Sequence, residues 1–89
     1  MTYKSISDGD KVTKYAALAG TAMAAAGGRI IARGTPVAVK EAGEATRTVV
    51  IEWDNLDAAE KAYNSEGNQE AFAVLDGGAV REFRYIEAV

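Results

Sequence analysis

Hydrophobic and polar positions change their spacing several times along the chain, and each change marks a predicted element. From Val12 to Ala26, small and apolar side chains recur every three or four residues, which predicts an amphipathic helix. Asp8 precedes this stretch as an N-cap residue, and Gly27-Gly28 follows it as a helix stop. The short segment Thr2–Ser7 before the helix is predicted to be the first strand.

Three later segments are predicted to be strands. Arg47–Trp53 is rich in β-branched residues, and Arg29–Arg33 and Val80–Glu87 have apolar residues over strand-like lengths. Val37–Lys40 is a candidate extension of the second strand, as an edge or as a hairpin piece, because Pro36 before it fits an edge better than a sheet centre. Ala42–Ala45 is expected to form a turn.

Two helical stretches lie between the last two predicted strands. The first is Leu56–Tyr63, with Asp54 or Asn55 as its N-cap, and the second is Gln69–Leu75, with Ser65 as its cap. The resulting order, β-α-β-β-α-β, predicts an α+β fold of the ferredoxin-like sandwich type, with a four-stranded antiparallel sheet and helices on one of its faces.

Alternation along the strands divides their side chains between the two faces of the sheet. The better apolar positions are expected to face the helices: Ile30, Ala32, Val49, Ile51, Trp53, Phe83 and Tyr85. The open face then mixes apolar and charged residues: Arg29, Ile31, Arg33, Val50, Glu52, Val80, Glu82, Arg84 and Ile86. Such a face is too apolar for water and too charged for a monomer core. We therefore expect a homodimer that forms through the open face of the sheet.

Composition limits the chemistry of the chain. Its 89 residues, 48% hydrophobic and 26% charged, indicate a single globular domain over residues 1–89 that could use oligomerisation to supplement a small core. The absence of Cys and His excludes disulfides, zinc-thiolate and iron–sulfur sites, Ser-His-Asp triads and His-ligated haem. We predict no cofactor. We also predict no metal site, because a capped helix start explains the acidic residues Asp54, Asp57 and Glu60.

Charge and hydropathy indicate which partners and which cellular compartment to expect. Ten Lys and Arg against thirteen Asp and Glu give a formal charge of −3, and the basic residues are scattered, which disfavours a nucleic-acid partner. The longest uncharged run, Tyr15–Gly28, is too short to span a bilayer. The N-terminal residues do not have the pattern of a signal peptide, so no membrane partner and a cytoplasmic location are expected.

Several short motifs occur in a fixed order along the chain: Ala24–Arg29, Arg33-Gly34, Val49–Trp53, Ala58-Ala59, Tyr63–Ser65 and Gln69. In order and spacing they resemble the domain of unknown function 1330 family, from Asp8 to Tyr85. The resemblance implies a dimeric α/β barrel, in which two ferredoxin-like subunits pack sheet against sheet. That architecture agrees with the independent argument from the faces of the strands.

The resemblance implies an architecture more than an activity, since the family has no established reaction. Members often carry His at the position of Ala26, and many place Tyr at the position of Asn68. Chemistry that depended on either residue elsewhere would be missing from this chain. The first predicted strand is also unusually short and polar.

The charged residues of the predicted open face are candidates for binding and catalysis. Arg29, Arg33, Glu52, Glu82 and Arg84 are expected to face one cavity. The arginines could hold the carboxylate of a small organic acid, and a carboxylate in a half-apolar cavity can act as a base, so Glu52 is the candidate for proton transfer. The alternative is that these groups form ion pairs between subunits.

Aromatic residues offer a second candidate site. Tyr15, Tyr63 and Trp53 could line a ligand cleft between helices and sheet, although aromatic residues at such spacing are more often core. Two classes of function stay open at this point. One is a small-molecule-binding protein or cofactor-free enzyme that acts on a small carboxylate or carbonyl compound. The other is a non-catalytic oligomeric module with buried ion pairs.

Overall fold

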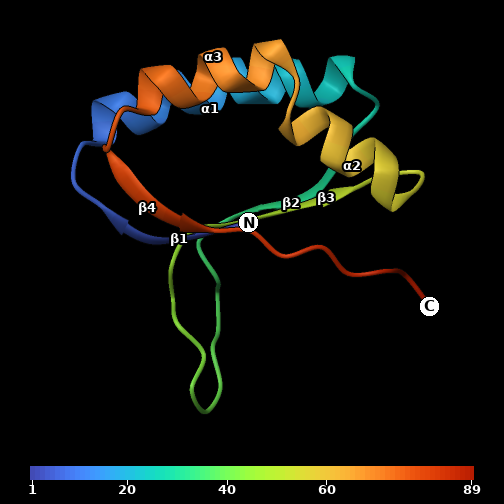
Figure 1. Ribbon diagram of the computed structural model, residues 1–89. Helices are drawn as coiled ribbons and strands as arrows, with labels where there is room; N and C mark the ends of the chain where they lie inside the picture. The colour runs from blue at the N-terminus through green and yellow to red at the C-terminus, as the bar shows by residue number, and fades with distance from the viewer.

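The computed structural model describes residues 1–89 and confirms the predicted α+β fold and its element order. The elements are β1 (Thr2–Ile6), α1 (Gly9–Ala25), β2 (Arg29–Gly34), β3 (Thr48–Glu52), α2 (Leu56–Tyr63), α3 (Glu66–Leu75) and β4 (Ala79–Glu82). All three helices cover the same face of a four-stranded sheet, which leaves the other face open (Figure 1). None of these helices is both long and apolar enough to cross a membrane.

Capping side chains fix where the helices begin. The carboxylate of Asp8 accepts hydrogen bonds from the first backbone N–H groups of α1, at 3.1 and 3.2 Å. For α2 the cap is Asn55, whose Oδ1 accepts from Ala58 N at 2.8 Å, and Asp54 takes no part in it. Ser65 caps α3, as predicted, and the helix begins earlier than expected, at Glu66.

The sheet consists of two strand pairs that are joined along a short seam. Its order is β2-β3-β1-β4, as in a ferredoxin-like fold, and all neighbours are antiparallel. Along the seam between β1 and β3, Thr2 is paired with Thr48, and the Met1 ammonium donates to the Val49 carbonyl at 2.7 Å. Burial lowers the pKa of this ammonium. Beyond Val49, β3 has no strand beside it on the β1 side.

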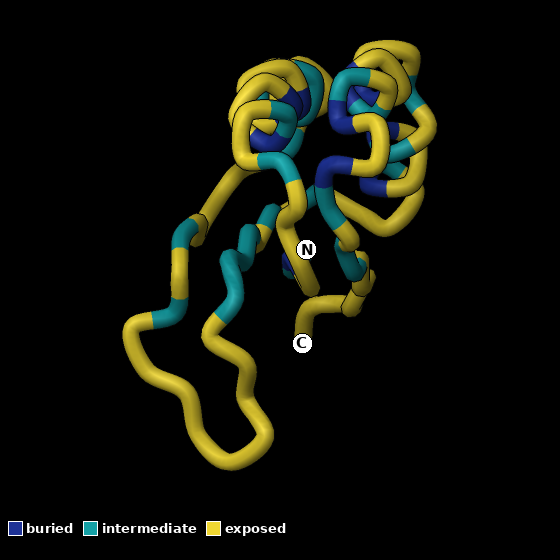
Figure 2. The backbone as a smooth tube through the Cα atoms, turned by 90° about the vertical axis from the view of Figure 1, so that its left-hand side faces the viewer, coloured by how far each residue is buried: buried dark blue, intermediate teal, exposed yellow.

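The core lies over only one of these two pairs. Helices α1 and α3 lie side by side (Figure 2), and a cluster of buried residues fills the space beneath them: Tyr3, Val12, Tyr15, Ala19, Ala71 and Leu75. All six side chains belong to β1, α1 and α3. The half of the sheet formed by β2 and β3 is less well covered, so space remains between it and α1.

A β-bulge changes which residues of β2 face the helices. The register between β2 and β3 shifts around Ile31, and one extra residue reverses the alternation that follows it. Arg33 is paired with Val49 and lies on the helix side, whereas Ala32 is paired with Val50 on the open side. The expectation that Ala32 faces the helices and Arg33 faces the open side is therefore wrong.

The predicted strand extension between β2 and β3 is also wrong. Residues 35–47 form a long connection without strand structure, and it projects from the sheet on the side away from the helices (Figure 1). Gly34 has a φ of 150°, which few other residues adopt, and Pro36 cannot donate a ladder hydrogen bond. Val37–Lys40 therefore leaves the ladder, and the turn comes at Lys40–Gly43, where Gly43 N donates to Lys40 O at 2.8 Å.

The last strand is shorter than the predicted Val80–Glu87. As an edge strand, β4 can pair only with β1, and its last partner there is Thr2, which lies opposite Glu82. Residues 83–89 therefore have no strand to pair with and leave the sheet (Figure 1). Phe83 still faces the helices, as predicted, because its ring contacts those of Tyr63 and Phe72.

Candidate functional site

A cavity of about 80 Å³ occupies the space between the helices and the β2–β3 half of the sheet. Its polar lining consists of Tyr3, Tyr15, Arg33, Arg47 and Asn68, and the rest of the lining is apolar or glycine. No acidic residue lines it. The cavity therefore combines an apolar wall with polar groups from five separate points of the chain, which is typical of a small-molecule site.

Two arginines give this cavity its charge. Arg33 reaches the cavity from β2 because of the bulge. Arg47 is the residue immediately before β3, and its backbone carbonyl accepts a hydrogen bond from Tyr3 N at 3.0 Å. Neither guanidinium takes part in any of the ion pairs of the molecule. Since unpaired guanidinium groups bind carboxylates in bidentate fashion, the lining favours a small anion.

Arg81 lies next to this cavity and fixes Tyr15. Its Nη1 donates to the Tyr15 hydroxyl at 2.6 Å, and its guanidinium carbon lies 4.6–5.0 Å from the ring centres of Tyr15, Phe72 and Phe83. Burial raises the pKa of Tyr15, although the nearby Arg81 charge opposes this. Tyr15 thus keeps its proton at neutral pH. Because its oxygen accepts from Arg81, that proton is available to a ligand.

Asn68 is the most deeply buried polar side chain of the lining. It is 1% exposed, and its Nδ2 donates to the Tyr63 carbonyl at 2.8 Å. Its Oδ1 is buried and has no hydrogen-bond partner. An unpaired buried acceptor of this kind costs about 1–3 kcal/mol, so the position needs a physical explanation.

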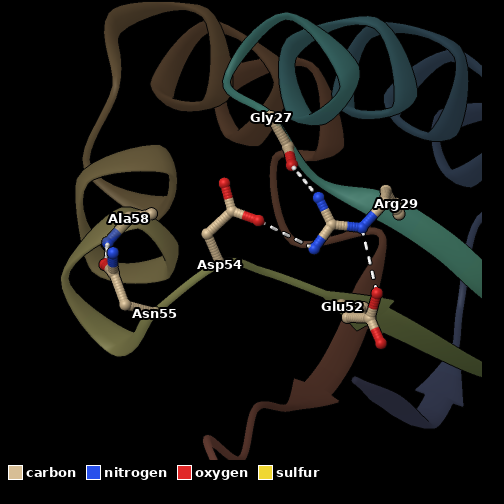
Figure 3. Close-up of polar contacts among 6 residues, drawn as sticks. All are labelled: Gly27, Arg29, Glu52, Asp54, Asn55 and Ala58. Atoms are coloured by element: carbon tan, nitrogen blue, oxygen red, sulfur yellow. Dashed lines mark hydrogen bonds and ion pairs between the residues drawn. The ribbon is translucent and has the colours of Figure 1, made fainter.

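Arg29 belongs to a different cluster, at the exposed end of β2 and β3 (Figure 3). Its Nε donates to Glu52 Oε1 at 3.0 Å, its Nη2 to Asp54 Oδ1 at 3.1 Å and its Nη1 to Gly27 O at 3.5 Å. The hydrogen bonds that Arg29 donates to Glu52 and Asp54 raise the pKa of Arg29. Asp54 therefore holds Arg29 instead of capping α2.

The expectation that five charged residues face one cavity is wrong. β2 and β4 are the opposite edges of the sheet, so Arg29 on β2 lies far from Glu82 on β4. Glu82 is hydrogen-bonded to Arg84 and pairs with Lys4 at 3.3 Å, and both interactions lower the pKa of its carboxyl. Arg33 is thus alone in the helix-side cavity, Arg29 pairs with Glu52, and Glu82 pairs with Arg84.

A second, more open hollow of about 770 Å³ lies between β3, α2 and residues 83–88. Tyr63, Trp53, Glu52 and Arg84 line it, and Tyr15 does not. The two tyrosines that were expected to share a cleft therefore belong to different hollows. No group of three or more Asp or Glu side chains is placed to hold a metal ion.

The comparison with family models agrees with the resemblance seen in the sequence. The model of Domain of unknown function (DUF1330) matches residues 1–89, the whole chain. The chain belongs to the DUF1330 family. No curated protein matches this DUF1330 chain. The family model shows this membership, and the ferredoxin-like element order agrees with it.

Of the residues proposed from the sequence, the DUF1330 cavity brings together only Arg33 and Tyr15. Sequence reasoning missed Arg47, Asn68 and Arg81. Arg81 carried a usable signal, since it lies two residues before Phe83 and so on the same, helix-facing side of the predicted strand Val80–Glu87. Asn68 was visible only as a departure from the family pattern.

Proposed function

We propose that this DUF1330 protein binds the anion of a small organic acid in the cavity between helices and sheet. One observation carries the proposal: Arg33 and Arg47 line a cavity that has no acidic residue, and neither has an ion-pair partner. A ligand carboxylate would supply the missing negative charge. The Tyr15 hydroxyl, polarised by Arg81, would donate a further hydrogen bond to it.

The same lining favours binding over proton transfer. It contains no carboxylate, and the chain has no histidine or cysteine, so no side chain of the cavity is an ordinary general base. Glu52, the base expected from the sequence, lies in the other hollow and is held by Arg29 at 3.0 Å. Glu52 therefore has no part in the proposed binding.

Calorimetric titration with acetate, the simplest carboxylate, tests the proposal. We expect Arg33→Gln and Arg47→Gln each to weaken binding by about tenfold, because each removes a charge-assisted hydrogen bond. Arg29→Gln is the matched control, since Arg29 is already occupied by Glu52 and Asp54 outside the cavity. Equal affinities of all three variants and the unaltered protein would contradict the proposal.

Native mass spectrometry of the freshly purified protein adds an independent test. A retained anion would appear as a small mass excess that is lost on denaturation. We expect this excess to be absent from Arg33→Gln. An excess that persisted in that variant would show a ligand bound elsewhere in the molecule.

A second candidate function, a homodimeric module, is favoured by the open face of the sheet. Ile31 is 61% exposed, Val80 57% and Val50 44%, and all three lie on that face. Apolar side chains so arranged are typical of a surface that packs against another protein. We propose a second copy of the chain as the partner, which is compatible with anion binding on the other side of the sheet.

A further inference from the structure

We propose that the anion held in the cavity is a short-chain monocarboxylic acid, a carboxylate with an unbranched tail of about three carbon atoms. This inference rests on the proposed function and adds the uncharged part of the ligand. It is carried by the arrangement of the lining, which is charged at one end of the β2–β3 pair and apolar at the other.

The strand register places the two arginines of the lining at one end. Arg33 on β2 is paired with Val49 on β3, and Arg47 precedes Val49 by two residues. Long side chains at such diagonal positions on one face of a strand pair can reach the same group. Arg33 is exposed and Arg47 is half-buried, so a carboxylate that enters from solvent can reach both residues. The head of the ligand therefore belongs at this end.

Apolar side chains line the other end of the cavity. Ile30 on β2 is paired with Ile51 on β3, two residues beyond Val49, and Met23 of α1 lines the cavity with them. None of these three side chains is fully buried, and Ile30 is 40% exposed. A ligand methylene that covers apolar surface of this kind gains binding free energy. This end therefore favours a hydrocarbon tail over a second polar group.

Gly20 leaves room for such a tail. It lines the cavity from α1, on the helix face that it shares with Ala16 and Met23. Outside its own helix, a Cβ atom at Gly20 would meet nothing within 4 Å. A side chain at this position would extend into open space, which a ligand tail can occupy instead.

The volume of the cavity limits the length of the tail. A cavity of roughly 150 Å³ is known to hold benzene, with its six carbon atoms. In proportion, the cavity of about 80 Å³ here takes a tail of about three carbon atoms. The carboxylate at the exposed Arg33 adds little to the enclosed volume. Butyrate has a tail of this length and is the probe ligand.

A series of acids of increasing length tests the inference on the unaltered protein. In calorimetric titrations at fixed ionic strength, we expect the affinity to rise about fourfold for each methylene from acetate to butyrate. Hexanoate should gain nothing further, because butyrate already fills the cavity. Succinate has a second carboxylate in place of the methyl group of butyrate. It should bind at least about tenfold more weakly than butyrate, because that charge would have to enter the apolar end.

Substitution of Gly20 should remove the preference for the longer acid. We expect Gly20→Leu to reduce the butyrate-to-acetate affinity ratio from about tenfold or more to about one, because the leucine side chain takes the space of the tail. Leucine also favours a helix more than glycine does. Thr21→Leu is the matched control, since it adds the same side chain at the next, exposed position of α1, outside the lining, and it should keep the full ratio. Arg33→Gln should weaken both acids by the same factor.

The outcomes separate the inference from the proposed function. Equal binding of acetate and butyrate, with both weakened by Arg33→Gln, would overturn the assignment of the tail alone, as would tighter binding of succinate than of butyrate. A ratio that Gly20→Leu leaves unchanged, or an affinity that keeps rising to hexanoate, would place the tail outside the cavity and overturn the inference as well. Absence of binding by every acid would overturn both proposals. If Gly20→Leu fails to fold, the acid series on the unaltered protein still decides the question.

Discussion

Arg81 is held under the helices by aromatic rings and by a phenol oxygen, with no carboxylate as its partner. A guanidinium group is less strongly hydrated than an ammonium and can stack on rings, so this position suits Arg and not Lys. The pair formed by Arg81 and Tyr15 orients the Tyr15 hydroxyl at the cavity. The orientation of Tyr15 in the cavity therefore depends on Arg81, which does not itself line the cavity.

The pKa of Tyr15 makes a prediction about stability at high pH. Burial raises this pKa above its ordinary value of 10.0, so the folded protein holds the phenol proton more tightly than the unfolded chain does. Stability from this group is complete below pH 10 and is lost as pH rises toward the folded-state pKa. We expect the free energy of unfolding, measured with urea, to fall above pH 10 and to fall less steeply in Tyr15→Phe. The same slope in both proteins would contradict this.

At the scale of elements, the sequence located all three helices because each has a local start signal, although it placed the start of α3 three residues too late. Asp8 and Ser65 cap helices as predicted, and Gly27-Gly28 follows the first helix. Strand limits could not be read in the same way. β4 ends at Glu82 because its neighbour β1 offers no further partner, and that depends on pairing between distant segments.

The bulge at Ile31 explains why Arg33 lies apart from the charged residues that it was expected to join. The alternation of side chains along a strand assigns each residue to the correct face of the sheet before a bulge and to the wrong face after it. Nothing in the sequence Arg29–Arg33 marks the position of this bulge. Arg33 was therefore expected on the open face together with Arg29 and Glu52, and it lies instead in the cavity with Tyr15. Val49 and Ile51, on the regular strand β3, were placed correctly.

The choice of cap for α2 gives a prediction at the same scale. Asn55 Oδ1 accepts from Ala58 N at 2.8 Å, and Asp54 points to Arg29 (Figure 3). We expect Asn55→Ala to lower the free energy of unfolding by about 1 kcal/mol. Asp54→Ala, the neighbouring control, breaks only an exposed ion pair and should cost less than about 0.5 kcal/mol. Urea unfolding of both variants checks the order, and a reversed order would contradict the assignment.

At the scale of the whole molecule, the chain is a thin slab with one covered face and one open face. Its principal extents are 36 × 34 × 15 Å, and only 10 of its 89 residues are buried. A core this small supports only modest stability, which makes association through a second apolar surface favourable. The site and the open face lie on opposite sides of the sheet, so ligand binding and assembly can be altered separately.

The proposed homodimer is tested by placing a charge on the open face. Val50 lies at the centre of that face on β3, so Val50→Glu would bury an unpaired carboxylate in the interface. We expect the dimer dissociation constant, measured by analytical ultracentrifugation, to rise about a hundredfold or more. Leu18→Glu is the matched control, because Leu18 is 46% exposed against 44% for Val50 but lies on α1, away from the sheet. We expect the Leu18→Glu variant to dimerise as tightly as the unaltered protein. Acetate affinity should be unaffected in both variants. A monomer in the unaltered protein, or a dimer that both substitutions leave intact, would contradict assembly through this face.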